Sequence, residues 1–131
     1  MKKIPANALV VVADGAGARL FRNVGHGGDV SLQKDGEFDP SNLRDDGPSG
    51  VRPPESTRQE TDEATFAKQL AKELYRRAHR GEFEHLVIIA DRQTLGQLRP
   101  SLHKEVQQRL VREVTKALTN SSIEDIETAM S

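Results

Sequence analysis

Two short stretches of the sequence are nearly identical: LVVVADG at residues 9–15 and LVIIADR at residues 86–92. Each is a continuous, largely β-branched apolar run, which is typical of a strand covered on both faces. The segment between them has a helical pattern over residues 61–80, so the second strand follows a crossover and should lie parallel to an earlier strand. This order of elements predicts an α/β fold in which helices flank a sheet.

The helix predicted over residues 61–80 carries an apolar stripe with a spacing of four. The stripe consists of Phe66, Leu70, Leu74 and Ala78. Acidic residues occupy the start of the helix and basic residues its end, which complements the helix dipole, and Gly81 is predicted to end it. One side of this helix should therefore pack on the sheet.

The N-terminal segment is predicted to form an antiparallel meander. Its strands span residues 8–13, 19–24 and 30–34, and the glycine-containing turns DGAGA and GHGGD separate them. The sheet should therefore be antiparallel at its start and parallel at the crossover strand over residues 86–90.

After this strand, apolar residues again recur at every fourth position. They are Leu98, Leu102, Val106 and Leu110. Pro100 suits the first turn of a helix through these positions. Residues 111–118 are compatible with an extension of that helix or with a further strand. Ser121 and Glu124 have the spacing of a capping box, which predicts a last short helix.

Residues 36–60 differ in composition from the rest of the chain, because four prolines and several glycines interrupt any apolar periodicity. A structureless segment of this length is uncommon inside a small domain and is usually functional or disordered. We expect a single domain over residues 1–131 with a long flexible loop at 36–60. Arg44, Arg52 and Arg58 in this loop are candidate residues for binding RNA or a protein partner.

Composition excludes several classes of function. The chain has 131 residues, no cysteine and a formal net charge of −1. Without cysteine there are no disulfides, thiolate metal sites or cysteine nucleophiles. Without a basic excess, any binding to nucleic acid needs a local patch. The N-terminal apolar run is shorter than a signal peptide or a membrane span requires, so we expect a cytoplasmic protein with no membrane partner.

Asp14 and Asp91 are the candidate catalytic residues. If the strands before them are parallel neighbours, both carboxylates lie at the carboxyl edge of the sheet, where open α/β sheets bind ligands. There they could perform acid–base chemistry or hold a divalent cation. We favour the structural alternative, in which Asp14 stabilises a turn and Asp91 caps a helix. The histidines have no metal-binding spacing and no phosphate-binding loop is present, so we expect no metal, no cofactor and no enzymatic activity.

Clusters of basic residues are the remaining signal, because a basic surface suits phosphate groups. The residues that could form it are Arg76, Arg77, Arg80, Arg99, His103, Lys104, Arg109 and Arg112. Glu73, Glu105 and Glu113 are interleaved with them, so the alternative, which we favour by a small margin, is an ordinary solvated surface. Contact with RNA remains open on this basis.

The order of the motifs resembles a known bacterial family, the host-attachment proteins. The similarity is carried by VVVADGAGARLFRN, by the long polar loop, by FAKQLAKEL and above all by HLVIIADRQTLGQLRPSLHKEV. In that family the second strand is followed by Leu-Gly-x-Leu-Arg. The motif stands here as Leu95, Gly96, Leu98 and Arg99. The resemblance covers essentially the whole chain.

That family in turn resembles the central domain of archaeo-eukaryotic peptide-chain release factors. The resemblance implies a mixed sheet of about five strands flanked by helices, with a last strand within residues 111–118. In release factors the loop before the first long helix carries Gly-Gly-Gln, which enters the peptidyl-transferase centre and helps water attack peptidyl-tRNA. The loop lacks Gly-Gly-Gln here, and GGD at residues 27–29 lies too early in the chain. Hydrolysis of peptidyl-tRNA is therefore not expected.

Three functions follow as hypotheses. The leading one is a non-enzymatic binding module that contacts structured RNA or the ribosome through residues 36–60 and the neighbouring basic helix surfaces. The second is a metal-dependent hydrolase or nuclease that uses Asp14 and Asp91. The third is a protein-interaction module whose 36–60 loop orders on a protein partner.

Overall fold

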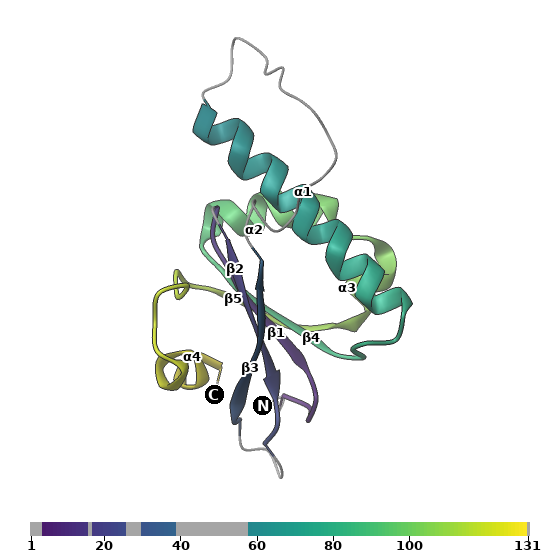
Figure 1. Cartoon of the computed structure of the whole chain (residues 1–131), viewed down its shortest axis with the longest axis vertical. Helices are drawn as coiled ribbons and strands as arrows, with labels where there is room; N and C mark the ends of the chain where they lie inside the picture. The colour runs from purple at the N-terminus through teal and green to yellow at the C-terminus, as the bar shows by residue number, and fades with distance from the viewer. Residues whose placement is uncertain (1–3, 16, 26–29, 39–57, 131) are drawn as a thin grey trace.

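The computed structural model describes residues 4–15, 17–25, 30–38 and 58–130, with the backbone alone for residues 38 and 58–64. Strands and helices follow one another in the order β1 (Leu9–Ala13), β2 (Ala18–Asn23), β3 (Leu32–Phe38), α1 (Arg58–His79), β4 (Leu86–Ala90), α2 (Arg92–Leu98), η1 (Arg99–Ser101), α3 (Lys104–Arg109), β5 (Leu110–Thr115) and α4 (Ile123–Met130). Figure 1 shows their arrangement.

The strands form one five-stranded sheet in the order β3-β2-β1-β4-β5. β1 pairs antiparallel with β2 and parallel with β4. β2 pairs antiparallel with β3, and β4 pairs parallel with β5. The predicted α/β fold class is confirmed: a mixed sheet of about five strands with an N-terminal antiparallel meander and a parallel crossover strand, flanked by helices.

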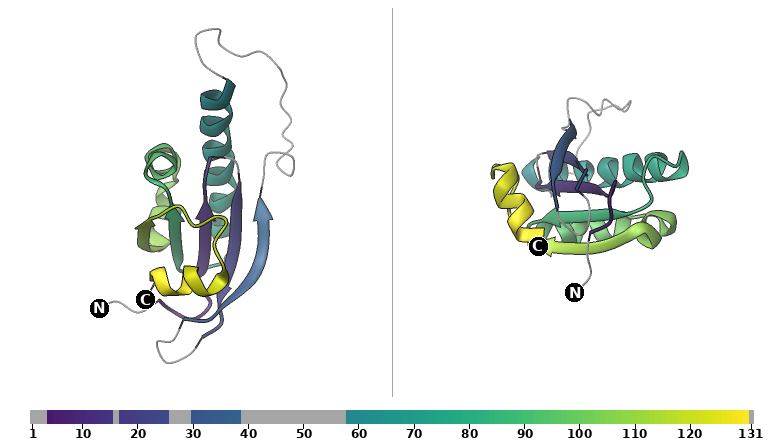
Figure 2. Two further views of the ribbon diagram at one scale, coloured as in Figure 1. Left: turned by 90° about the vertical axis from the view of Figure 1, so that its left-hand side faces the viewer. Right: turned by 90° about the horizontal axis from the view of Figure 1, so that it is seen from below.

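Helices cover both faces of this sheet (Figure 2). In β1, Leu9 and Val11 pack in the cluster formed with α1, α2 and α3, whereas Val10 and Val12 pack in the cluster that contains α4. All residues of β1 and β4 are 0% exposed, because both faces of these central strands are covered. The two nearly identical apolar runs are therefore the centre of the core.

α1 packs its predicted apolar stripe on the sheet. The stripe residues are at most 1% exposed: Phe66, Leu70, Leu74 and Ala78. The helix ends in a Schellman turn, in which the Gly81 N–H donates to the Ala78 carbonyl at 2.9 Å. The Glu82 N–H donates to the Arg77 carbonyl, also at 2.9 Å. Gly81 has a φ of 73°, which glycine adopts without strain, so the predicted helix end is confirmed.

The third strand and the loop after it differ from the prediction. β3 runs over Leu32–Phe38 instead of residues 30–34, and α1 begins at Arg58, so elements occupy both ends of the predicted 36–60 loop. The strand passes through Gly36, which has a φ of 148° and follows a register shift against β2. Such an irregularity breaks the alternation of side chains by which a strand is recognised in a sequence.

The helix predicted through Leu98 and Leu110 is wrong, because three short elements take its place. α2 ends at Leu98, and Pro100 lies in the first turn of η1. Proline has no N–H with which to continue α2. α3 then starts after His103, whose Nδ1 accepts the Glu105 N–H at 3.0 Å.

The C-terminal part resolves the alternatives left open by the sequence. β5 occupies Leu110–Thr115, so the strand assignment is correct and agrees with the resemblance to release factors. The last helix is present, but the capping box predicted at Ser121 and Glu124 is wrong by one residue. The hydroxyl of Ser122 accepts the Asp125 N–H at 3.1 Å and caps α4 instead.

A buried asparagine joins the N-terminal segment to the meander. Asn23 is 1% exposed. Its Nδ2 donates to the carbonyls of Ile4 and Pro5 at 3.2 and 3.1 Å. Its Oδ1 accepts the N–H groups of Gly25 and Ser31 at 3.0 and 3.1 Å. The side chain therefore uses its full capacity for hydrogen bonds.

We expect Asn23→Ala to lower the free energy of unfolding by about 2–3 kcal/mol, because four backbone groups lose these partners. Chemical denaturation followed by circular dichroism measures the loss. Asn120→Ala, the same change at an exposed asparagine, is the matched control and should stay within about 0.5 kcal/mol of the wild type. Equal effects at the two positions would contradict the role assigned to Asn23.

Candidate functional site

Both carboxylate oxygens of Asp14 accept hydrogen bonds within the fold. Oδ1 accepts the Gly17 N–H at 2.9 Å, which helps to close the turn between β1 and β2. Oδ2 accepts the Thr119 hydroxyl at 2.7 Å, from the segment between β5 and α4. Arg19 reinforces this attachment by donating to the carbonyls of Thr119 and Ser121 at 3.2 and 2.8 Å. Asp14 therefore stabilises a turn and attaches the C-terminal segment to the sheet.

Asp91 is the N-cap of α2. Its Oδ2 accepts the Thr94 N–H at 3.1 Å, and its Oδ1 accepts the Thr94 hydroxyl at 2.6 Å. Thr94 is 4% exposed, so this pair of hydrogen bonds is largely shielded from water. The cap satisfies a backbone donor that a helix start otherwise leaves without a partner.

The two carboxylates lie at the same edge of the sheet, as predicted, because Ala13 and Ala90 are partners in the parallel pair of β1 and β4. Each carboxylate is held by the turn or helix that follows its own strand. Among the residues that the structure describes, no group of three or more His, Cys, Asp or Glu side chains could hold a metal ion. The geometry thus favours the structural role of Asp14 and Asp91.

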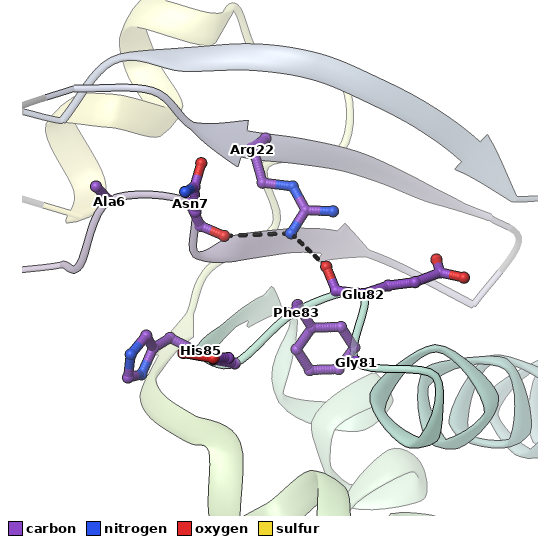
Figure 3. A pocket seen from close by; sticks show the side chains of 8 residues that line it. Ala6, Asn7, Arg22, Gly81, Glu82, Phe83 and His85 are labelled. Carbon is purple, nitrogen blue, oxygen red and sulfur yellow. Dashed lines mark hydrogen bonds between the residues drawn. The ribbon is translucent and has the colours of Figure 1, made fainter.

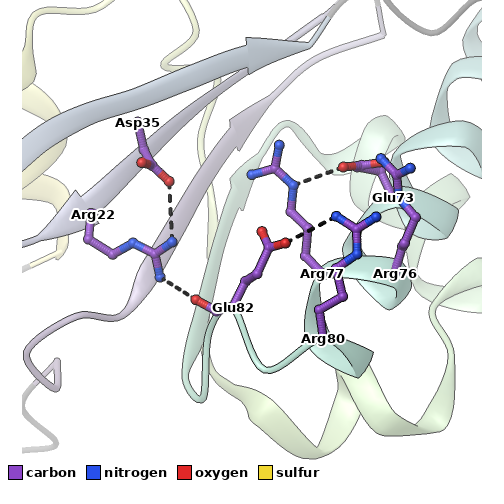
Figure 4. Close-up of polar contacts among 7 residues, drawn as sticks. All are labelled: Arg22, Asp35, Glu73, Arg76, Arg77, Arg80 and Glu82. Carbon is purple, nitrogen blue, oxygen red and sulfur yellow. Dashed lines mark hydrogen bonds and ion pairs between the residues drawn. The ribbon is translucent and has the colours of Figure 1, made fainter.

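The arginines predicted on α1 take part in ion pairs (Figure 4). Glu73 accepts hydrogen bonds from Arg76 and Arg77, the latter at 2.9 Å. Arg80 pairs with Glu82 at 3.3 Å. The side chains of Arg76 and Arg80 are each 57% exposed, whereas that of Arg77 is 22% exposed. Arg76 and Arg80 are therefore accessible from solvent, whereas Arg77 is much less accessible.

Arg99 joins η1 to β5. Its Nε and a terminal nitrogen donate to Glu113 at 3.0 and 2.6 Å. The hydrogen bond to Glu113, and after it the attraction between the two charges, raises the pKa of the Arg99 guanidinium above its ordinary value. The group is exposed, so the pair lies in water and contributes little stability. Arg99 therefore pairs with a different acidic residue from those that pair with Arg76, Arg77 and Arg80.

The other predicted binding residues belong to the long loop. Arg44 and Arg52 lie outside the described residues, as do the GGD residues 27–29. Arg58 begins α1, and its side chain also lies outside the described part. The structure therefore does not test the role predicted for the 36–60 loop.

A row of exposed basic side chains follows the outer side of α1. It consists of Lys68, Lys72 and Arg76 on α1 and of Arg80, the residue directly after its end, and we call it the α1 ridge. Residues four apart lie on one side of a helix, about 6 Å apart along its axis, so the ridge spans about 18 Å. It lies opposite the buried stripe that begins with Phe66.

The lysines of the α1 ridge were missed by the sequence analysis, which considered only the arginines of this helix. Within the described part of the chain, the side chains of Lys68 and Lys72 have neither an ion pair nor a hydrogen bond. Both are exposed. The signal that could have identified them is their spacing of four from Arg76 and Arg80, out of phase with the apolar stripe.

A cleft of about 460 Å³ opens at the edge of the sheet where β1 and β4 begin, opposite the edge that holds Asp14 and Asp91 (Figure 3). It is lined by Ala6, Asn7, Arg22, Gly81, Glu82, Phe83, Glu84 and His85. Arg22 donates to the carbonyls of Asn7 and Glu82 at 3.2 and 3.1 Å, and it pairs with Asp35 at 3.3 Å. Its hydrogen bonds connect three segments, so its role here is structural.

In the part of the chain described, every helix is too short or too polar to cross a bilayer.

The mixed five-stranded sheet with helices on both faces is the α/β architecture that the resemblance to release factors implies. The comparison of the sequence with family models agrees with this class. Residues 7–130 match the family described as bacterial archaeo-eukaryotic release factor family 12, and the chain belongs to that family. The predicted relation to archaeo-eukaryotic release factors is therefore confirmed. No curated protein matches the chain.

We expect Asp91→Ala to lower the free energy of unfolding by about 1 kcal/mol, because α2 loses its cap, and Asp91→Ser to retain most of the stability. Thermal unfolding of the three proteins measures this loss.

Thermal unfolding with and without Mg²⁺ tests whether Asp91 also binds a metal ion. If Asp91 acts only as a cap, Mg²⁺ leaves the midpoint of the wild type unchanged. A rise in the midpoint with Mg²⁺ that disappears in Asp14→Asn would contradict the structural assignment.

Proposed function

We propose that this protein is a non-enzymatic RNA-binding module that associates with the ribosome or with structured RNA. The observation that carries the proposal is the α1 ridge, in which Lys68 and Lys72 have no acidic partner in the described structure. A cation without a partner is available to a phosphate group without breaking an existing ion pair.

The distribution of charge supports this proposal. The whole chain has a net charge of −1, so no general attraction draws it to nucleic acid. A local array of cations is then required, and the α1 ridge supplies one on a rigid helix. Arg76 and Arg80 extend the array, although Glu73 and Glu82 partly offset their charge.

The position of the α1 ridge also fits the family. Figure 1 shows that the first turns of α1 extend beyond the edge of the sheet. β3 ends at this same edge, where Phe38 pairs with Ala18 at the start of β2. The ridge therefore lies on a helix whose first turns extend beyond the sheet. In release factors, the connection that leads into this helix carries Gly-Gly-Gln. In this proposal, the protein keeps the fold of the family and binds RNA but does not hydrolyse peptidyl-tRNA.

We expect the double variant Lys68→Glu/Lys72→Glu to bind RNA more weakly at low salt and to show a smaller dependence on salt. If each lysine contacts one phosphate of a single strand, the slope of log K against log salt falls by about 1.4 in magnitude. Fluorescence anisotropy with a labelled RNA measures the slope. Co-sedimentation with ribosomes at low salt tests the natural setting.

The matched control compares Lys72→Glu with Lys34→Glu, because both reversals change the net charge equally. Lys34 is 59% exposed and lies on β3 opposite Phe21, which packs in the cluster that contains α4 and not in that of α1. Lys34→Glu should leave RNA binding close to that of the wild type. If both reversals weaken binding equally, or if the wild type binds neither RNA nor ribosomes at low salt, the proposal is wrong.

A further inference from the structure

Three rings gather beside the α1 ridge. The Tyr75 ring stacks on the His103 ring, with centroids 4.0 Å apart and an interplanar angle of 29°. The His79 ring lies 5.8 Å from Tyr75 at 38°. Tyr75 and His79 are one turn apart on α1, and His103 precedes α3. We call this group the ring cluster.

Two rings of the cluster are exposed and the third, Tyr75, is half-buried and packs against the core, whereas the described phenylalanines are fully buried. Phe21, Phe66 and Phe83 are at most 3% exposed and belong to the core. The His79 side chain is 72% exposed, and His103 is exposed as well. Flat ring surfaces in water next to cations are the arrangement on which nucleic-acid bases stack.

The ring cluster and the α1 ridge run side by side. Tyr75 lies three residues after Lys72, and His79 lies three residues after Arg76, so each ring neighbours a ridge cation on the helix surface. The rings lie on the side of α1 that faces α3, because Tyr75 contacts His103. A single strand along α1 would therefore meet cations on one side and rings on the other.

The acidic residue beside the ring cluster is itself paired with a cation. Glu105 lies 3.7 Å from the Nδ1 of His79 and 3.6 Å from Arg109. The rings offer faces on which a neutral base can stack, whereas Lys68 and Lys72 on the ridge offer cations without an acidic partner in the described structure to phosphates.

We propose that the ligand of this surface is a single-stranded segment of RNA, of the kind that a structured RNA presents in its loops, whose phosphates lie along the α1 ridge and whose bases stack on the ring cluster of Tyr75, His79 and His103. This inference rests on the proposed function and specifies the class of RNA. A duplex keeps its bases stacked inside and presents only its backbone to the rings. The full chain should therefore bind a single strand more tightly than a duplex of the same length.

The test uses three probes of equal length: a single-stranded RNA of about twelve nucleotides, its duplex, and an abasic oligomer with the same sugar-phosphate backbone. We expect the wild type to bind the single strand about ten-fold more tightly than the abasic oligomer, since one base–ring stack is typically worth that much or more. Tyr75 is the only tyrosine and the chain has no tryptophan, so intrinsic fluorescence reports on this residue alone. The single strand should quench it, and the abasic oligomer should not.

Variants separate the rings from the charges. His79→Gln/His103→Asn removes two rings, while asparagine retains an acceptor for capping α3. It should lower the affinity for the single strand towards that of the abasic oligomer, with the remaining preference due to Tyr75, and leave the affinity for the abasic oligomer unchanged. Tyr75→Phe keeps the ring and should bind as the wild type does, whereas Tyr75→Leu should bind the single strand more weakly. Circular dichroism confirms that each variant is folded.

The outcomes distinguish this inference from the proposed function. If Lys68→Glu/Lys72→Glu weakens binding of all three probes but the wild type does not prefer the single strand, the ring cluster does not stack bases and RNA binding through the ridge stands. The same conclusion holds if the histidine double variant keeps the preference. If the lysine double variant binds every probe as the wild type does, both proposals are wrong.

Discussion

The parallel pairing of β1 with β4 is the contact on which the rest of the structure depends. Every residue of the two strands is 0% exposed, so both faces must be covered. One face is covered by α1 with α2 and α3, and the other by α4 together with Ile4 near the N-terminus. Because a parallel pair needs a crossover, α1 has to run across the sheet with one side buried. Its opposite side is left to solvent, and that is the side that carries the α1 ridge.

The candidate catalytic residues serve this same architecture. Asp14 and Asp91 follow the two paired strands, at the points where a hairpin turn and a helix begin and backbone donors have no partner in the sheet. A carboxylate at such a point satisfies those donors directly, as Asp91 does for the N–H of Thr94. Asp14 also holds the segment that leads to α4 through the hydroxyl of Thr119, so it helps to cover the second face of the sheet. In both Ala-Asp sequences, the aspartate therefore accepts a backbone N–H just after the end of a central strand.

The fold could be predicted largely from local patterns, and the failures have a common physical cause. β4 was predicted with its observed bounds and α1 with its buried stripe, because an uninterrupted run or a regular period is visible in the sequence. β3 was predicted with the wrong bounds because the strand is irregular at Gly36. The α2–α3 region was predicted as one helix because its apolar spacing of four continues past Pro100, where the backbone leaves α2. The candidate site shows a parallel limit. The sequence shows which residues of α1 are basic but not which of them have acidic partners. The candidates chosen from it were the arginines, and Lys68 and Lys72 were not among them.

The difference between arginine and lysine on α1 follows from what each contributes. Glu73, with a side chain only 10% exposed, is a costly charge near the core unless donors satisfy it, and Arg76 and Arg77 supply those donors. Arg76 and Arg77 thus satisfy a carboxylate near the core and help to keep α1 in place. The lysines one and two turns before Arg76 have no such task in the described structure and retain their hydration. A binding surface built in this way separates the charges that hold the helix from those that meet a ligand, so a phosphate can engage the ridge without weakening the contact between helix and sheet.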